Sequence, residues 1–238
     1  MQEELKALVS LINSWQEENI ELAFQILKGN RTFKQEVAAL YGPILELIGK
    51  KFSKNNVLSI PVELGYAKFC NKEIPYSQEL EAILLTIPIT YLDYSYRNLE
   101  ILPWWVCSLR KLSEINLSNN KLEALAEEIV NLTDLQFLNV NHNKLKTLPQ
   151  NIGNLTRLEK LQLDYNDIAI IPDSLGELVN LEWLCLEANK IEKLPKTLEN
   201  LKNIEWVSVE NTPLGNKHKI SYGMYMGVKD KRFKKLLG

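Results

Sequence analysis

The sequence of 238 residues has few of the side chains that carry catalysis or bind metals, with only two histidines and three cysteines. Cys70, Cys107 and Cys185 lie far apart and none belongs to a C-x-x-C pair, so neither a disulfide framework nor a thiolate metal site is predicted. Separated cysteines in odd number are typical of reduced thiols. We therefore expect no metal, no cofactor and a cytoplasmic protein.

Motifs of the common enzyme classes are also absent. The chain has no G-x-x-x-x-G-K-[ST] phosphate loop, no G-x-G-x-x-G, no G-x-S-x-G and no H-E-x-x-H. A hydrolase or transferase in the N-terminal segment ranks last among the hypotheses, because residues 1–50 hold neither histidine nor cysteine. The expectation is a protein that is not an enzyme.

Long apolar runs and a large charge of one sign are missing as well. No run reaches the roughly 18 apolar residues that cross a bilayer, and the first residues lack the features of a signal peptide. The formal net charge of −2 argues against attraction of the whole chain to nucleic acid or anionic lipid.

What the sequence does have is a 23-residue period in its second half. Apolar residues recur at four positions of each repeat, which we number 1, 4, 6 and 11 with Leu112 at position 1. Position 9 is asparagine in four successive repeats, at Asn120, Asn143, Asn166 and Asn189. The phase holds without an insertion, which indicates a repeat architecture.

The segments LQFLNVNHNKL, LEKLQLDYNDI and LEWLCLEANKI resemble the leucine-rich repeat pattern L-x-x-L-x-L-x-x-N-x-L. The repeats are similar to the 23-residue type of many bacterial proteins and of Ras-associated repeat proteins. The resemblance covers 89–214, as five full repeats and one partial repeat. It implies an α/β fold: a solenoid with a parallel β-sheet on its concave face.

Asparagine at position 9 is expected to satisfy buried backbone groups, because its amide both donates and accepts hydrogen bonds. Arg97 and Thr212 stand at this position in the first and last repeats and interrupt the ladder. Prolines are expected to turn the chain toward the convex side, with Ala126 in place of one of them; they are Pro103, Pro149, Pro172 and Pro195.

The flanks are predicted to form three further units. Residues 1–50 have helical apolar spacing and are predicted to be a small helical domain, followed by a connecting segment over 51–88 that covers the end of the sheet. Residues 215–238 form a basic C-terminal cap or tail. Trp104 and Trp105 replace polar pairs of later repeats and are expected to be covered by the N-terminal domain, or else to form a second binding patch.

With no catalytic motif, function is expected on the exposed positions 2, 3, 5, 7 and 8 of the strands. Position 3 is rich in aromatic residues, and positions 2 and 7 turn acidic in the last three repeats. Cys185, at position 5, is expected to be accessible. The predicted partner-binding residues are Tyr91, Phe137, His142, Lys160, Asp164, Tyr165, Trp183, Glu187, Trp206 and Glu210.

These features favour a protein-interaction scaffold whose acidic and aromatic concave face binds a protein or peptide with basic and apolar groups. The outer aromatic residues could instead be covered by the chain's own flanks, and the acidic rows could serve solubility alone. The alternative function is an adaptor to an anionic partner, nucleic acid or membrane, through the basic C-terminal tail. Neither a small-molecule substrate nor a particular oligomeric state is predicted.

Overall fold

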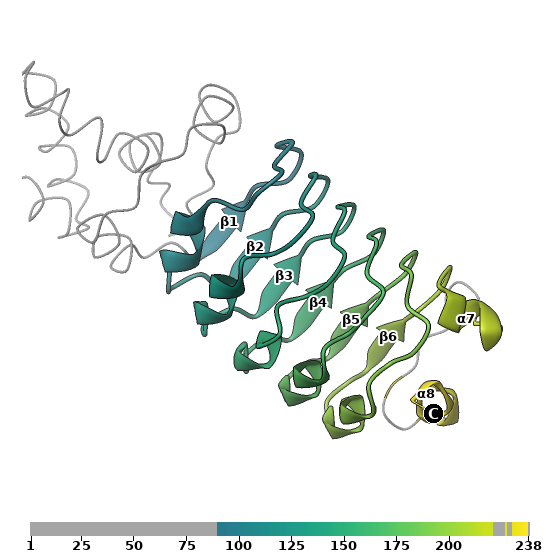
Figure 1. The fold of residues 1–238 in the computed structure, drawn as a ribbon. Helices are drawn as coiled ribbons and strands as arrows, with labels where there is room; N and C mark the ends of the chain where they lie inside the picture. The colour runs from purple at the N-terminus through teal and green to yellow at the C-terminus, as the bar shows by residue number, and fades with distance from the viewer. Residues whose placement is uncertain (1–89, 221–226, 228–229, 238) are drawn as a thin grey trace, which may run out of the picture.

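A computed structural model describes residues 90–220, 227 and 230–237. The predicted helical domain over 1–50 and the connecting segment over 51–88 lie outside these residues and stay predictions. The described part is a solenoid in which one strand per repeat adds to a parallel sheet in the order β1 to β6 (Figure 1). The predicted leucine-rich-repeat solenoid is therefore confirmed for this part.

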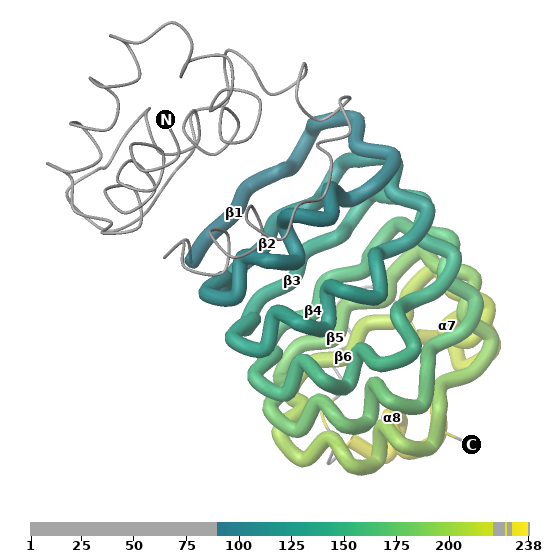
Figure 2. Tube along the Cα trace, turned by 60° about the vertical axis from the view of Figure 1, so that its left-hand side comes forward, coloured from purple at the N-terminus to yellow at the C-terminus, as the bar shows by residue number. Residues whose placement is uncertain are grey.

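Each repeat contributes a three-residue strand and, between strands, a short 3-10 helix on the opposite side of the coil (Figures 1 and 2). The strands are β1 (Tyr91–Asp93), β2 (Glu114–Asn116), β3 (Phe137–Asn139), β4 (Lys160–Gln162), β5 (Trp183–Cys185) and β6 (Trp206–Ser208). The 3-10 helices are η1 (Trp104–Ser108), η2 (Glu127–Asn131), η3 (Ile152–Asn154), η4 (Asp173–Glu177) and η5 (Lys196–Asn200). Two α-helices follow, α7 (Pro213–Lys217) and α8 (Lys231–Leu236). None of the helices in the described ranges has the length and apolar character needed to cross a bilayer.

The register of the sheet follows the 23-residue period, so equivalent residues lie directly beside one another. Phe137 pairs with Lys160, Lys160 with Trp183, and Trp183 with Trp206. Neighbouring strands of a sheet are about 4.8 Å apart. Residues that share a repeat position therefore form rows along the solenoid.

The core contains the apolar positions that the period predicts. Described residues at positions 1, 4, 6 and 11 are at most 4% exposed. The 3-10 helices add a second layer, and Val106, Ile129, Ile152, Leu175 and Leu198 are fully buried at 0%. Burial of this layer closes each coil, and it was not part of the sequence prediction.

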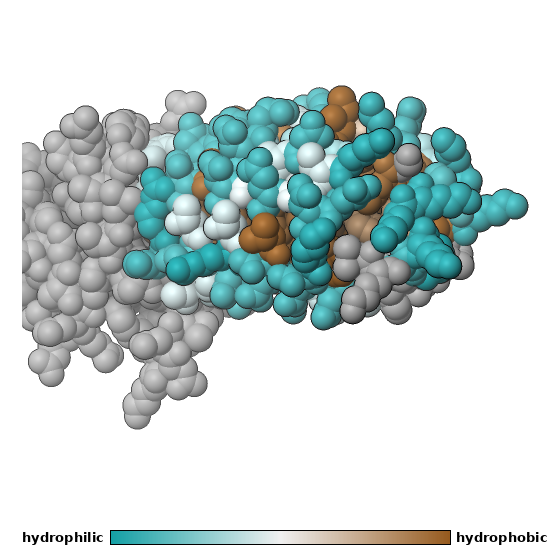
Figure 3. Space-filling model, turned by 90° about the horizontal axis from the view of Figure 1, so that it is seen from below, coloured by the Kyte–Doolittle hydropathy of each residue, from teal (hydrophilic) through white to brown (hydrophobic). Residues whose placement is uncertain are grey.

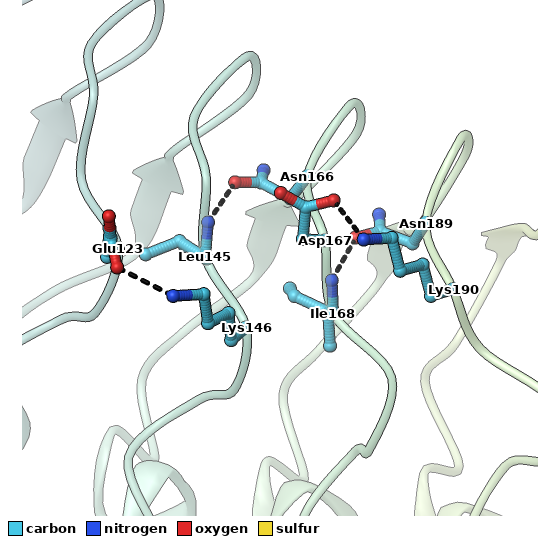
Figure 4. Close-up of polar contacts among 8 residues, drawn as sticks. All are labelled: Glu123, Leu145, Lys146, Asn166, Asp167, Ile168, Asn189 and Lys190. Carbon is cyan, nitrogen blue, oxygen red and sulfur yellow. Dashed lines mark hydrogen bonds and ion pairs between the residues drawn. The ribbon is translucent and has the colours of Figure 1, made fainter.

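The asparagine ladder forms as predicted. Asn143 accepts a hydrogen bond from the Leu122 N–H at 3.0 Å and donates through Nδ2 to the Leu117 and Val140 carbonyls, each at 3.0 Å. Asn166 and Asn189 repeat this arrangement one and two strands further on (Figure 4). Each amide therefore joins its own repeat to the one before it.

The chain reaches this geometry through a left-handed residue at position 8 of every described repeat. Tyr96, Asn119, His142, Tyr165, Ala188 and Asn211 have φ between 52° and 58°. Asparagine tolerates this conformation, whereas tyrosine, histidine and alanine adopt it at an energetic cost. Because all six repeats share the turn, it is a property of the fold.

Charged side chains at the loop edges, outside the strands, pair across neighbouring repeats. We call three of these contacts the edge pairs; two of them are drawn in Figure 4. The nitrogen–oxygen distance is 2.7 Å in each of Lys146–Glu123, Arg157–Asp134 and Lys190–Asp167. Opposite charges thus alternate from one repeat to the next along these edges.

The C-terminal end of the core is closed by α7 and α8. Thr212 replaces the ladder asparagine: its hydroxyl donates to the Val209 carbonyl at 2.6 Å and accepts from the Gly215 N–H at 2.9 Å, which caps α7. On α8, Phe233 and Leu236 are 1% and 3% exposed and join the core. The segment predicted to be a basic cap or tail thus covers the core end with apolar residues.

Seen from below in Figure 3, the described surface is mainly hydrophilic, and hydrophobic residues appear in small separate groups. Trp105 is buried and its ring packs edge-on against Tyr94, with centroids 6.0 Å apart, while Trp104 is half-buried against the core. The predicted cover from the N-terminal domain lies outside the described residues. The domain boundaries likewise stay predictions.

Candidate functional site

We call the surface formed by the outward side chains of β1–β6, the residues directly before these strands and the turns that follow them the strand face. It corresponds to the predicted concave face. On this face Trp183 and Trp206 stack on each other and Lys160 lies over the Trp183 ring. We call these three residues, at position 3 of successive repeats, the aromatic stack. The two indole rings lie 4.9 Å apart and nearly parallel, at 11°, and the Lys160 ammonium lies 5.1 Å from the centre of the Trp183 ring.

The aromatic stack continues toward the N-terminus without close ring contact. Phe137 is half-buried beside Lys160, and Glu114 is exposed beyond it. Tyr91 lies at the far end of the row on β1, where its hydroxyl donates to Asp93 at 3.4 Å. Burial, followed by the charge of Asp93, raises the Tyr91 pKa. Tyr91 on β1 lies three strands away from Lys160 on β4, so among the predicted residues it is remote from the aromatic stack.

A second cluster forms where the strands pass into the turns. His142 and Tyr165 stack with centroids 4.4 Å apart and an interplanar angle of 11°. The Tyr165 hydroxyl donates to Glu187 at 3.2 Å, and the Asn211 amide donates to the same oxygen at 3.1 Å. The turn cluster of His142, Tyr165 and Glu187 is thus held together by one ring stack and one carboxylate.

The acidic residues of position 7 are partly structural. Asp164 accepts a hydrogen bond from the Glu187 N–H at 2.8 Å. Burial raises the Asp164 pKa to about 6, against this hydrogen bond and with help from the charges of Glu187 and Glu210. In the described part of the chain, no group of histidine, cysteine or acidic residues is arranged to hold a metal ion.

Two expectations about exposure are wrong. Cys185 was expected to be accessible, but it is 7% exposed and burial raises its pKa to about 12. Glu210 is 5% exposed, unlike the other nine predicted binding residues. Cys185 ends β5, which lies between β4 and β6, and Glu210 follows β6. Cys107 is also buried, and burial raises its pKa to about 12.

A side-chain network at positions 5 and 7 was missed by the sequence prediction. Asn116 and Asn139 accept from the N–H groups of Ser118 and Asn141 at 3.1 and 3.0 Å. Asn141 accepts from the Asp164 N–H at 2.7 Å. The recurrence of Asn and Asp at these two positions was the available signal, because such side chains bond to nearby backbone groups.

This arrangement of repeats defines a solenoid, and a family model matches part of it. Residues 110–168 match the family model for the leucine rich repeat. The match and the six-stranded parallel sheet show leucine-rich repeats in the described part of the chain. No curated protein sequence matches the chain.

Similar solved structures are bacterial. A leucine-rich repeat protein of Leptospira interrogans is 29% identical over 58% of this chain and 40% of its own, with a TM-score of 0.46. The internalin inlF of Listeria monocytogenes is 18% identical over 66% and 49%, with a TM-score of 0.50. Internalin inlC2 of the same species is 26% identical over 56% of each chain, with a TM-score of 0.48.

The chain matches about half the length of each of these proteins. The likeness to inlF shows the fold alone. Leucine-rich repeat proteins typically mediate protein–protein interactions, and their fold is generally non-catalytic.

Proposed function

We propose that this protein is a non-enzymatic interaction module that binds a protein or peptide on the strand face. The partner carries basic and apolar groups. The observation that supports this most directly is the half-exposed aromatic stack beside unpaired acids. Tryptophan and tyrosine are enriched at binding hot spots, where they combine a large apolar surface with few rotatable bonds.

Electrostatics supports the same face. Glu159, Glu182 and Glu205 are neighbours on adjacent repeats and form no ion pair with the described residues. Like charges one strand apart repel each other. A cationic partner would relieve this repulsion, whereas an anionic partner would increase it.

The experiment compares native protein with the variants Trp183→Ala and Phe137→Ala as baits in lysate of the cells that make it. Quantitative mass spectrometry should find partners that both variants lose. Ile170→Ala is the matched control, because Ile170 is an exposed apolar residue, 68% accessible, outside the strands. Circular dichroism and the melting temperature of each variant check that a loss of capture does not come from unfolding. Equal capture by all four proteins would refute the proposed face.

The second candidate is an adaptor to nucleic acid or anionic membrane through the basic C-terminal segment. Lys231, Lys234 and Lys235 on α8 are exposed and support it, whereas the acidic strand face does not. This function requires binding that weakens steeply with salt. Substituting the three lysines with glutamine and measuring retention on heparin and on anionic vesicles distinguishes it from the first candidate.

Two finer features complete the proposal. The 23-residue spacing supports assignment of the repeats to the type found in bacterial and Ras-associated repeat proteins. The three separated cysteines support a cytoplasmic location. Cell fractionation tests that location directly.

A further inference from the structure

The two faces of Trp183 are occupied differently. Trp206 on β6 stacks on one face at 4.9 Å, and Lys160 on β4 approaches from the opposite side with its ammonium 5.1 Å from the ring centre. A cation over an indole ring is attracted by the negative face of the aromatic system. Trp183 therefore already binds a cation, supplied by the chain itself.

Lys160 is an easily displaced occupant of this position. Its side chain is exposed, and within the described residues it forms no ion pair with a carboxylate. Exposed cation–aromatic contacts are weak, because the ammonium keeps most of its hydration. A flexible lysine can leave the ring and extend into solvent.

Withdrawal of the Lys160 side chain would free a slot at its place in the position-3 row. Phe137 on β3 and Trp183 on β5 flank this place and are two strands apart. Two strand spacings amount to about 9.6 Å. A planar group needs about 3.5 Å to each flanking side chain, roughly 7 Å in all, so the spacing leaves room for one such group.

The surroundings of the slot are anionic. Every member of the aromatic stack follows directly on a glutamate in the chain, whereas position 2 is neutral in the first three repeats. The glutamates are Glu159, Glu182 and Glu205. Charge and shape together favour a cation that is planar.

We propose that this slot receives an arginine side chain of the protein partner and that Lys160 holds the slot until the partner arrives. The proposal rests on the proposed function and names the chemistry that its strand face recognises. A guanidinium is planar, less hydrated than an ammonium, and carries donors that bond carboxylates in pairs. It can therefore stack on Trp183 while hydrogen bonding to the glutamate that precedes an aromatic residue.

The test uses the full-length protein and L-argininamide, with L-lysinamide and L-citrullinamide as matched ligands. Citrullinamide has the shape of argininamide without its charge. Binding is followed by NMR through the five tryptophan indole N–H signals, with the Trp183 signal assigned from Trp183→Phe. Argininamide should shift the Trp183 signal and bind at least threefold more tightly than lysinamide, and citrullinamide should leave the signal in place.

The variant Lys160→Ala separates a displaced occupant from a direct contact. Loss of the competing ammonium should tighten argininamide binding at least twofold, while Lys144→Ala, an exposed lysine outside the strands, should leave it unchanged. Equal affinity for argininamide and lysinamide, or weaker binding by Lys160→Ala, overturns the proposal. If either result occurs while Trp183→Ala still loses its captured partner, the proposed function stands and only the arginine chemistry falls.

Discussion

The loop edges and the strand face use charge in opposite ways, although both follow the same 23-residue period. At the edges, opposite charges meet across neighbouring repeats, as in Arg157–Asp134 and Lys190–Asp167 at 2.7 Å. On the strand face, equal charges meet, as in Glu159, Glu182 and Glu205. The repeat places equivalent residues beside each other in both regions, so the difference comes from the residues chosen.

The two arrangements have opposite effects on stability. Edge pairs contribute only a little to folding, because they are exposed and solvent screens their charges. Like charges in a row reduce stability by similar amounts. The strand face from β4 to β6 therefore has a composition that stability alone does not explain, and binding gives a reason for it.

The largest predicted effect is a loss of stability at one of two asparagines of the same repeat. Asn143 belongs to the buried ladder, whereas Asn141 lies at the strand face. Asn143→Ala should lower the free energy of unfolding by about 2–3 kcal/mol, because it leaves the buried Leu122 N–H without its acceptor and removes one of the two amide donors to each of the Leu117 and Val140 carbonyls. Asn141→Ala removes one acceptor for the Asp164 N–H at the strand face and should cost about 1 kcal/mol or less. Urea unfolding of both variants measures the difference. Equal losses would contradict the structural role given to position 9.

Next in size is the pH dependence that comes from Asp164. Its pKa in the folded protein, about 6, lies above the unfolded value near 4, because burial and neighbouring acids favour the neutral form. The stability that this group contributes is therefore fully present below about pH 4 and is lost as the pH rises through about 6, by at most about 3 kcal/mol. Unfolding free energies measured from pH 4 to 8 should show this decline.

The matched variant for that measurement is Asp164→Asn. The amide oxygen can still accept from the Glu187 N–H, while the charge is gone. Its pH profile should be flatter than the native one between pH 4 and 6, and it should be more stable than the native protein at pH 7. A native decline that persists unchanged in this variant would assign the effect to another group.

Two charge reversals, one at a loop edge and one on the strand face, test whether the two regions use charge in opposite ways. Arg157→Glu places two acids side by side at a loop edge and should lower stability by about 0.5–1 kcal/mol. Glu182→Lys introduces a cation between Glu159 and Glu205 and should raise stability by up to about 0.5 kcal/mol. Denaturation at low and high salt measures both effects, which should shrink together as salt screens the charges. Effects of the same sign would remove the distinction between the two regions.

The smallest predicted effect is a gain in stability from a substitution directly before the 3-10 helix η2. Ala126 precedes η2 with φ −61° and ψ 141°, close to Pro172 before η4 at −68° and 146°. Ala126→Pro should stabilise by about 0.4–1 kcal/mol by restricting the unfolded chain. The melting temperature should rise while partner capture stays native, because the site is remote from the strand face. A fall in melting temperature would show that η2 begins differently from η4.

The sequence predicted the fold of the described repeats well, because the period fixes both the core and the register. Leu138, Leu161 and Leu184 are buried as expected, and Asn143 bonds as expected. Predictions of exposure within the strand face were poorer. Cys185 and Glu210 are buried although the repeat pattern places both outside the core, because burial depends on contacts that the pattern of a single repeat does not describe.

The candidate site was predicted as rows rather than as contacts. The aromatic and acidic rows follow from the period, but the stacking of Trp183 on Trp206 and of His142 on Tyr165 depends on side-chain rotamers. The hydrogen bond from Tyr165 to Glu187 joins two repeats, so no single unit of the sequence contains it. Whether these residues bind a partner is for the proposed experiments to decide.

The substitution of Thr212 for the ladder asparagine has a consequence for the length of the array. Each asparagine serves the repeat before it, whereas Thr212 bonds Val209 within its own repeat and starts α7. A new repeat placed after Thr212 would meet α7 and α8, which already cover the end of the core. A 23-residue copy inserted between β4 and β5 would meet the same neighbours as the original and keep its ladder contacts. The protein is thus extensible from within, and its strand face can grow by whole strands while its C-terminal closure stays fixed.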